Sequence, residues 1–238
     1  MKTVLITGGS RGIGSEMVRA FAEKGYRVAF TYKSSTEAAE ALSRECGALA
    51  IRADSCVEAD VENAVATVEK ELGNVEILIN NAAVSSFSLF TDLSLDDWRA
   101  SFGASVDGAF LYTRRALPSM IRSGQGRIIN VSSVWGLVGS SCEVHYSSAK
   151  AALIGMTKAL AKEVGPSGIT VNCIAPGFIE TEMNAKLTEE DVADIVDSTP
   201  LMRTGKTSDV AAAALFLASD EASFITGDVL NVSGGFVI

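Results

Sequence analysis

The stretch KTVLITGGSRGIGSEMVRAFAEK, residues 2–24, decides the fold of this chain. Its apolar start, KTVLIT, predicts a buried strand, and the spacing of apolar residues over Ile13–Lys24 predicts an amphipathic helix. The turn between them, TGGSRGIG, carries four glycines. A strand, a glycine-rich turn and a helix in this order are typical of the first unit of an alternating α/β sheet.

The rest of the chain continues this alternation. Six further strands are predicted at Tyr26–Thr31, Ala48–Ala53, Ile77–Asn80, Arg127–Val131, Thr170–Ile174 and Val229–Val232. Helices are predicted at Thr36–Cys46, Val57–Leu72, Leu95–Arg122, His145–Val164 and Ser208–Ala218. Seven strands separated by helices predict one α/β domain, a doubly wound parallel sheet with helices on both faces. The looser segment Gly177–Met202 is predicted to be the most mobile.

Composition limits the class of protein. The 238 residues, 47% hydrophobic and 21% charged, suit a single globular domain over residues 1–238. The net charge of −9 argues against a nucleic-acid or anionic-membrane partner, since either requires a basic surface. Four cysteines without C-x-x-C spacing and one histidine predict no metal site. With no signal-peptide pattern and no apolar run near ~20 residues, we expect a cytoplasmic protein that does not enter a membrane.

The glycine-rich turn predicts a phosphate-binding site. Glycine lets a backbone turn tightly and approach a pyrophosphate at the positive end of a helix. The spacing Gly8-x-x-x-Gly12-x-Gly14 differs from G-x-G-x-x-G, and the alternative is a simple tight turn. Its place after the first strand favours a dinucleotide cofactor. The residues expected to hold it here are Gly8, Ser10, Arg11, Gly12, Ile13 and Gly14.

The end of the second predicted strand bears on the choice of cofactor. It reads Tyr32-Lys33, with no Asp or Glu to bind a ribose 2′-hydroxyl. Lys33 and Arg11 offer positive charge instead, which suits a 2′-phosphate and therefore NADP(H). The alternative is that both are ordinary surface cations.

Later strand ends add further cofactor residues. Asp54 is expected to accept from an adenine amino group, and small or amide side chains to lie beside the ribose. A loop after the sixth strand is expected to fix the nicotinamide carboxamide. These residues are Asn81, Ala82 and Ala83 at the ribose and Pro176, Gly177, Ile179 and Thr181 in the loop.

Ser133, Tyr146 and Lys150 are the candidate catalytic residues. In a helix, Tyr146 and Lys150 lie one turn apart on one face. The lysine charge favours the phenolate, so we expect the pKa of Tyr146 to fall from ~10 toward neutrality, which makes it a plausible proton donor. Ser133 would donate a hydrogen bond to the same substrate oxygen. Tyr-x-x-x-Lys taken alone is more often a solvated surface pair.

The motifs TGGSRGIG, NNAA, YSSAK and PGFIET, with Asp54 and Ser133, occur in the order of the short-chain dehydrogenase/reductase family, which the chain resembles from Thr3 to Gly235. The resemblance implies a Rossmann-type fold. It also implies that Tyr146 donates the proton, Ser133 orients a carbonyl, and Lys150 lowers the tyrosine pKa and holds the nicotinamide ribose. Tyr146 and Lys150 would thus also contact the cofactor.

Within the family the chain looks most like the 3-oxoacyl-acyl-carrier-protein reductases. This implies NADPH, a ketone substrate that is a small molecule or is bound to a carrier or protein, and a homotetramer or homodimer. The interfaces would be the helices near 95–122 and 146–164 and the C-terminal strand. A catalytically weak NADP-binding sensor or scaffold is a separate alternative.

The chain departs from the family pattern at three places. Ala83 replaces a glycine, which is tolerated if φ is negative there. Ser105 stands where the family has an asparagine that positions a water of the proton relay, and it either preserves or weakens that relay. Carrier-protein reductases have basic residues before the fifth and sixth strands, where this chain has Arg122 and Ser167.

A second substrate class rests on Glu143, one turn before Tyr146. The segment WGLVGSSCEVHYSSAK, together with the ending ITGDVLNVSGGFVI, also looks like a bacterial subgroup of the family. Members of that subgroup reduce a 5-aminopentanone group on a lysine of elongation factor P. An amine needs a carboxylate, and Trp135 could add a cation–π contact. The alternative is a solvated Glu143 near a helix start. His145, next to Tyr146, points about 100° away and is expected to be a wall or surface residue.

Overall fold

The strands form one parallel sheet. The computed structural model describes residues 1–184 and 188–237, and within them seven strands lie in the order β3-β2-β1-β4-β5-β6-β7. The strands are β1 Thr3–Ile6, β2 Arg27–Tyr32, β3 Leu49–Arg52, β4 Ile77–Asn80, β5 Gly126–Val131, β6 Ile169–Pro176 and β7 Val229–Val232. The predicted doubly wound α/β fold is confirmed, and each predicted strand is present to within two residues at either end.

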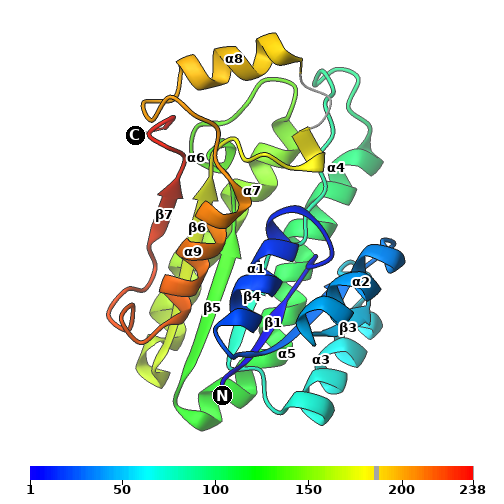
Figure 1. Ribbon diagram of the computed structural model, residues 1–238, viewed down its shortest axis with the longest axis vertical. Coiled ribbons are helices and arrows are strands. Elements are labelled where there is room, and N and C mark those ends of the chain that lie inside the picture. The colour runs from blue at the N-terminus through cyan, green and yellow to red at the C-terminus, as the bar shows by residue number, and fades with distance from the viewer. Residues whose placement is uncertain (185–187, 238) are drawn as a thin grey trace.

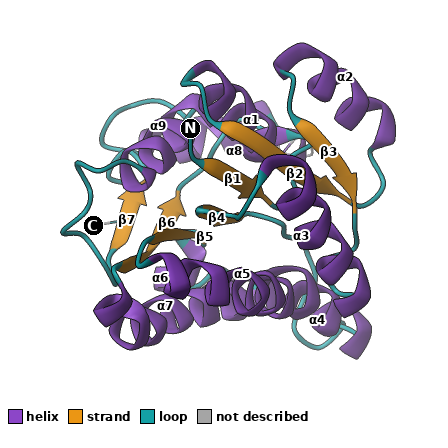
Figure 2. Cartoon of the chain, turned by 90° about the horizontal axis from the view of Figure 1, so that it is seen from below, coloured by secondary structure: helices purple, strands orange, loops and turns teal. Residues whose placement is uncertain are grey.

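Helices cover both faces of the sheet (Figures 1 and 2). One face packs against α1 Gly12–Glu23, α2 Thr36–Cys46 and α9 Thr207–Ala218. The other packs against α3 Glu58–Leu72, α5 Gly108–Ser123 and α7 Val144–Val164. Strands such as β1 and β4 are buried along their whole length because apolar side chains on both faces are covered.

The long helix predicted at Leu95–Arg122 is interrupted. It consists of α4 Leu95–Phe102, a π-helical turn η1 Gly103–Asp107, and α5. The loop after β3 packs closely against the end of this turn. A Cβ on Gly108, the residue that follows the turn, would lie only 2.8 Å from Ser55 Cβ. A π-turn inserts one residue into the helix and often marks a functional site.

Two α-helices were not predicted. α6 Trp135–Val138 follows β5, and α8 Glu189–Asp197 lies within the segment predicted to be mobile. α8 has a reciprocal cap in which Thr188 accepts from the Asp191 backbone and Asp191 accepts from the Thr188 backbone. Short 3₁₀ turns form at Gly165–Ser167 and Glu182–Asn184, and residues 185–187 lie outside the described part. None of the described helices has the length and apolarity of a membrane span.

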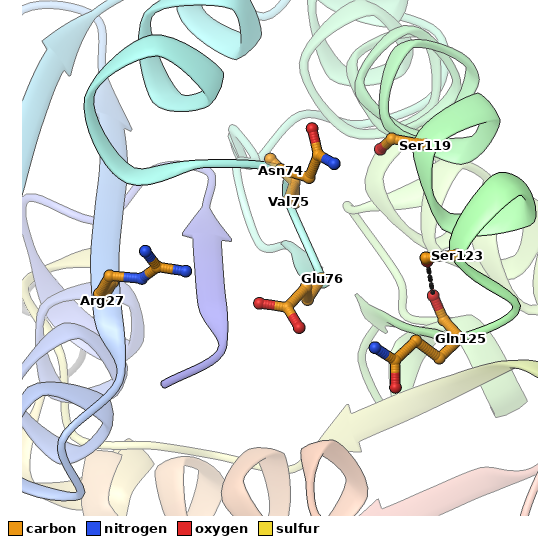
Figure 3. Close-up of a pocket in the computed structure, with 7 residues that line it drawn as sticks. All are labelled: Arg27, Asn74, Val75, Glu76, Ser119, Ser123 and Gln125. Atoms are coloured by element: carbon orange, nitrogen blue, oxygen red, sulfur yellow. Dashed lines mark hydrogen bonds between the residues drawn. The ribbon is translucent and has the colours of Figure 1, made fainter.

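Parallel pairing brings all carboxyl strand ends to one edge of the sheet, where Figure 1 shows α8 above the ends of β6 and β7. The strand order reverses between β1 and β4, which is where such sheets bind ligands. A polar hollow of about 240 Å³ opens at the opposite, amino edge, between Arg27, Glu76 and Gln125 (Figure 3). None of its lining residues is a predicted site residue.

Candidate functional site

The turn between β1 and α1 needs its glycines. Gly8 has φ +64°, and a Cβ there would lie 2.9 Å from the Ala82 Cα. A Cβ on Gly14 would lie 2.2 Å from the Gly8 carbonyl oxygen. Side chains at either position would push the turn away from β4 and α1. The glycines therefore let this turn pack closely against the segment after β4, at the point where the strand order reverses.

The N-terminus of α1 is suited to an anion. Its N-cap residue, Arg11, makes no side-chain cap hydrogen bond, and the first turn has no acidic residue. Among the described residues, the first N–H groups of the helix thus have no side-chain acceptor, and together with the helix dipole they favour a phosphate. Arg11 is exposed and pairs with Glu182 at 3.2 Å. The residues present fit the pyrophosphate of a dinucleotide.

The segment after β4 braces this turn. Asn81 Nδ2 donates to the carbonyl oxygens of Thr7 at 3.0 Å and Gly8 at 3.1 Å. The Thr7 hydroxyl accepts from the backbone N–H groups of Asn81 and Ala82. Ala83 does not have a positive φ, so the condition for replacing glycine there is met. The predicted Asn81 amide holds the glycine turn in place.

Lys33 and Asp54, predicted from different strand ends, lie together with Nζ 2.7 Å from Oδ2. The hydrogen bond to Asp54 raises the pKa of Lys33. Burial acts to raise the pKa of Asp54, but Lys33 and the backbone N–H of Cys56 lower it below its ordinary value. Tyr32 is half-buried beside them. Lys33 is exposed, which leaves most of its surface open to a ligand.

The loop after β6 reaches the glycine turn. A Cβ on Gly12 would lie 3.5 Å from the Thr181 methyl carbon. Ile179 is buried, and its carbonyl oxygen accepts from Asn184 Nδ2 at 2.8 Å. The Pro176 carbonyl accepts from the Val134 backbone, which ties this loop to the end of β5. The structure thus brings the loop and turn residues predicted for one cofactor into one place.

Ser133, Tyr146 and Lys150 also meet at this edge. Lys150 Nζ lies 5.5 Å from the centroid of the Tyr146 ring and donates to the Val131 carbonyl at 2.7 Å. Ser133 is buried, and its hydroxyl accepts from the Trp135 backbone at 3.2 Å. Lys150 is buried and Tyr146 half-buried. The predicted helix and its one-turn spacing place Tyr146 and Lys150 together, and the segment after β5 brings Ser133 within hydrogen-bonding reach of Tyr146.

The predicted fall in the tyrosine pKa was wrong for this arrangement. Burial, and then the negative charge of Glu143, raise the pKa of Tyr146 to about 12, while the nearby Ser133 hydroxyl lowers it only in part. Burial lowers the pKa of Lys150 to about 8. Because Nζ is held at the Val131 carbonyl, its charge does not outweigh these effects at the phenol.

Glu143 is buried, with 6% of its surface exposed. Its Oε1 accepts from the Ser85 hydroxyl at 2.7 Å. The alternative of a solvated Glu143 was wrong, because the loop after β4 covers the start of α7. A buried carboxylate with one neutral partner lies close to the proposed proton donor and can accept further hydrogen bonds.

His145 is also buried, and its Nε2 lies 3.0 Å from the Ser86 hydroxyl. His145 is thus a buried wall residue, and like Glu143 it contacts the loop after β4. Trp135 is half-buried and packs edge-on against Phe236. Ser105 lies buried in the π-helical turn, and its hydroxyl has no hydrogen-bond partner among the described residues. Its relay role stays a prediction.

Within the described part of the chain, no three His, Cys, Asp or Glu side chains gather in a way that could hold a metal ion. A family model described as enoyl-(acyl carrier protein) reductase matches residues 8–237. A 3-oxoacyl-[acyl-carrier-protein] reductase from Staphylococcus aureus is 38% identical over 239 residues, covering 98% of this chain and 97% of the relative. The chain belongs to the short-chain dehydrogenase/reductase family.

Other relatives in this family extend the comparison. A 3-oxoacyl-[acyl-carrier-protein] reductase from Aquifex aeolicus is 40% identical over 98% of this chain and 96% of the relative. An acetoacetyl-CoA reductase from Rhizobium meliloti is 40% identical over 98% of both chains. Short-chain dehydrogenase/reductases use a nicotinamide cofactor, and this member is an oxidoreductase of the ketoreductase type.

The sequence did not point to Ser85 or Ser132 as contacts of the site. Ser85 reaches Glu143 from 58 residues earlier. Ser132 donates to the Lys150 carbonyl at 2.7 Å. A signal was present for a third residue, Asn130, because an amide inside the apolar run RIINV requires a buried partner.

Proposed function

We propose that the chain reduces 3-oxoacyl thioesters to 3-hydroxyacyl thioesters with NADPH. The observation that carries this is the meeting of Ser133, Tyr146 and Lys150 at the carboxyl edge, in a chain whose relatives are named for 3-oxoacyl and acetoacetyl substrates. When bound, the nicotinamide would supply the hydride for the carbonyl carbon. The cofactor would be held by the glycine turn, the Asp54 region, the segment after β4 and the loop after β6.

In this proposal the side chains handle the oxygen and its proton. Ser133 donates a hydrogen bond to the carbonyl oxygen, and Tyr146 transfers its phenolic proton to that oxygen as it becomes a hydroxyl. The Lys150 ammonium stabilises the phenolate that remains, and solvent returns the proton. Stabilisation by Lys150 matters because the buried phenol otherwise holds its proton strongly.

A hollow beneath α8 is consistent with an acyl substrate. It measures about 490 Å³ and is lined by residues of α8, of the loop after β6 and of the segment before α9. Its apolar side chains are Phe178, Val192, Val196 and Met202. Such a lining suits the alkyl part of an acyl group.

NADPH is proposed over NADH because Arg11 in the glycine turn and Lys33 after β2 are exposed cations, each paired with one carboxylate in this structure. Charge-assisted contacts to a 2′-phosphate contribute ~1.5–3 kcal/mol, roughly a ten- to hundredfold preference. The kcat/KM values for the two cofactors should differ by this factor. In the double variant Arg11→Ala, Lys33→Ala, the kcat/KM values for NADPH and NADH should become similar. Lys24→Ala, at an exposed position, is the control and should keep the difference. Equal values in the wild type would contradict the proposal.

The substrate is tested with a panel at fixed NADPH. Acetoacetyl-CoA, a 3-oxoacyl group on acyl carrier protein and a matched enoyl thioester would be compared. We expect reduction of both ketones and not of the enoyl group, although the matching family model is described as an enoyl reductase. Reduction of the enoyl thioester alone would contradict the proposal. Cofactor binding without reduction of any ketone would indicate the sensor or scaffold alternative.

A second candidate is an amine-bearing ketone, such as a 5-aminopentanone group on a lysine of elongation factor P. The observation that favours it is the buried Glu143 carboxylate. It accepts a hydrogen bond from the Ser85 hydroxyl, and its negative charge helps to raise the pKa of Tyr146. An ammonium group would neutralise this charge. Glu143→Gln should then lose activity on an amino-ketone and keep it on a neutral ketone of equal length. Equal effects on both would rule out the amine role.

We further propose that the protein acts in the cytoplasm as a homotetramer or homodimer, as the family resemblance implies. Its net charge of −9 is consistent with the absence of nucleic-acid partners in this proposal. Substitution of exposed apolar side chains tests this oligomer.

A further inference from the structure

Consecutive residues at the end of β5 contact the catalytic helix α7. The Val131 carbonyl accepts from Lys150 Nζ at 2.7 Å, and the Ser132 hydroxyl donates to the Lys150 carbonyl at 2.7 Å. One residue earlier, Asn130 Nδ2 donates to the Thr157 hydroxyl at 2.8 Å. Lys150 is thus held by both its side chain and its backbone, and Thr157 marks a second contact seven residues further along the helix.

Asn130 is itself held from the neighbouring strand. It pairs in register with Asn80 of β4, whose Nδ2 donates to Asn130 Oδ1 at 2.9 Å and to the Thr113 hydroxyl at 3.1 Å. The Thr157 hydroxyl donates onward to the Leu153 carbonyl. All four polar side chains are at most 4% exposed. Since unpaired polar groups at such depth cost ~1–3 kcal/mol, these four hydrogen bonds favour one arrangement of the network, in which Asn80 Oδ1 alone has no partner among the described residues.

We infer that Ser132, Asn130 and Thr157 are positioning residues, which fix the rotation and axial register of α7 so that Tyr146 and Lys150 face Ser133. This inference rests on the proposed ketone reduction. A helix advances 1.5 Å and turns 100° per residue. Apolar packing is non-directional and tolerates small slips, whereas two hydrogen-bonded points seven residues apart do not. Gly136 of α6 packs closely behind, because a Cβ there would lie 2.8 Å from the Lys150 carbonyl carbon.

Paired substitutions at one position separate positioning from stability. Thr157→Val keeps the side-chain shape and removes the hydroxyl, and Thr157→Ser keeps the hydroxyl. We expect Thr157→Val to lower kcat about 10- to 100-fold, because small misplacements at a reacting centre have such effects. Thr157→Ser should retain most of the activity. Ser132→Ala should behave like Thr157→Val.

Ser119→Ala is the matched control. It removes a buried hydroxyl from α5 that donates to the Ala116 carbonyl and lies outside this network. It should lower the melting temperature as Thr157→Val does and leave kcat unchanged. An equal fall in kcat in both variants, or a lower melting temperature in Thr157→Val without a fall in kcat, would overturn the inference.

A crystal structure of Thr157→Val gives a readout that needs no substrate. We expect a changed separation of Ser133 Oγ and the Tyr146 hydroxyl, and an unchanged separation would contradict positioning. Failure of the wild type to reduce any ketone would instead contradict the proposed function and leave this structural test in force. Should Thr157→Val not fold, Ser132→Ala provides the same kinetic and structural comparison.

Discussion

At the residue scale, Tyr146 must release a proton that its surroundings hold. Burial and the charge of Glu143 raise its pKa to about 12. The proton is therefore transferred only as negative charge develops on the substrate oxygen in the transition state. Tyr146→Phe keeps the ring and removes the proton. We expect kcat for ketone reduction to fall ~10²–10⁴-fold, as for loss of a general acid. Affinity for NADPH should change little.

The control for Tyr146→Phe is Tyr112→Phe. Tyr112 is a fully buried phenol on α5 to which no role in the reaction is assigned. NADPH oxidation with acetoacetyl-CoA measures both variants, and fluorescence titration measures cofactor binding. Equal rates for wild type and Tyr146→Phe would remove Tyr146 from the mechanism.

Lys150 is predicted to reduce the stability of the fold. Burial lowers its pKa from 10.5 to about 8. Between these values the unfolded chain holds a proton that the folded chain has released, so stability rises with pH across this window. Below pH 8 the destabilising effect is complete. Lys150→Met should therefore inactivate the enzyme and raise its stability at pH 7 by about 1 kcal/mol, since the lost bond to Val131 offsets part of the gain.

Thermal unfolding of Lys150→Met at pH 7 and near pH 10 tests this. The gain should be largest at pH 7 and should shrink toward pH 10. Lys162→Met, at an exposed position of the same helix, should show no such dependence. A Lys150→Met variant less stable than wild type at pH 7 would show that the bond to Val131 outweighs the cost of burial.

The sequence predicted which side chains meet but not their electrostatics. The spacing of Tyr146 and Lys150 fixes one helix face, so their proximity followed from local geometry. The burial of Glu143 depends on Ser85, which lies in another loop, and no local pattern encodes that contact. The pKa of Tyr146 therefore could not be inferred from its neighbours along the chain.

At the element scale, the strands were predictable because each is a short apolar run ended by glycine or a polar residue. The π-helical turn was not predictable from local spacing; the loop after β3, distant along the chain, packs close to Gly108 at its end. α8 was missed because its nine residues include five acidic ones and none is buried. A helix without a buried face gives little periodic signal, although Thr188 and Asp191 form a recognisable cap.

This cap predicts that α8 depends on Thr188. Thr188→Ala removes the side-chain acceptor for the Asp191 backbone and should destabilise α8 by ~1 kcal/mol. Because α8 buries no residue, the global melting temperature should hardly change. Amide exchange over 189–197 should become faster. KM for acyl thioesters should rise two- to fivefold at similar kcat, because α8 lines the hollow.

Thr67→Ala is the control for Thr188→Ala. Thr67 is a half-buried residue inside α3 whose hydroxyl bonds only to the Asn63 carbonyl among the described residues. It should alter neither exchange over 189–197 nor KM. Faster exchange in α8 with an unchanged KM would show that α8 does not contact the acyl group.

At the scale of the whole molecule, the parallel sheet converts distant segments into one site. The glycine turn follows β1, and the catalytic serine and the loop that reaches Thr181 follow β5 and β6. All of these strand ends share one edge because every pairing is parallel. Order along the chain and the fold class therefore sufficed to predict the place of the site, whereas the cover provided by α8 depended on tertiary packing.

The surface predicts an assembly with two kinds of interface. Phe110 on α5 is 49% exposed, and Phe224, just before β7, is fully exposed. Phe110 lies on a helix, and Phe224 lies beside the C-terminal strand β7. The family resemblance implies that subunits contact one another through these two elements. A tetramer with three perpendicular twofold axes uses separate self-complementary interfaces. Each buried phenylalanine would contribute ~1.5–3 kcal/mol, repeated in every symmetric copy.

Phe110→Asp should therefore leave dimers joined near β7, and Phe224→Asp should leave dimers joined through the helices. The double variant should be monomeric, because a charged side chain at each interface removes apolar burial and adds a desolvation cost. Sedimentation equilibrium at several concentrations measures the masses. Val57→Asp, a 43% exposed position before α3, should remain a tetramer. A monomeric wild type, or single variants with the mass of the wild type, would contradict this assembly.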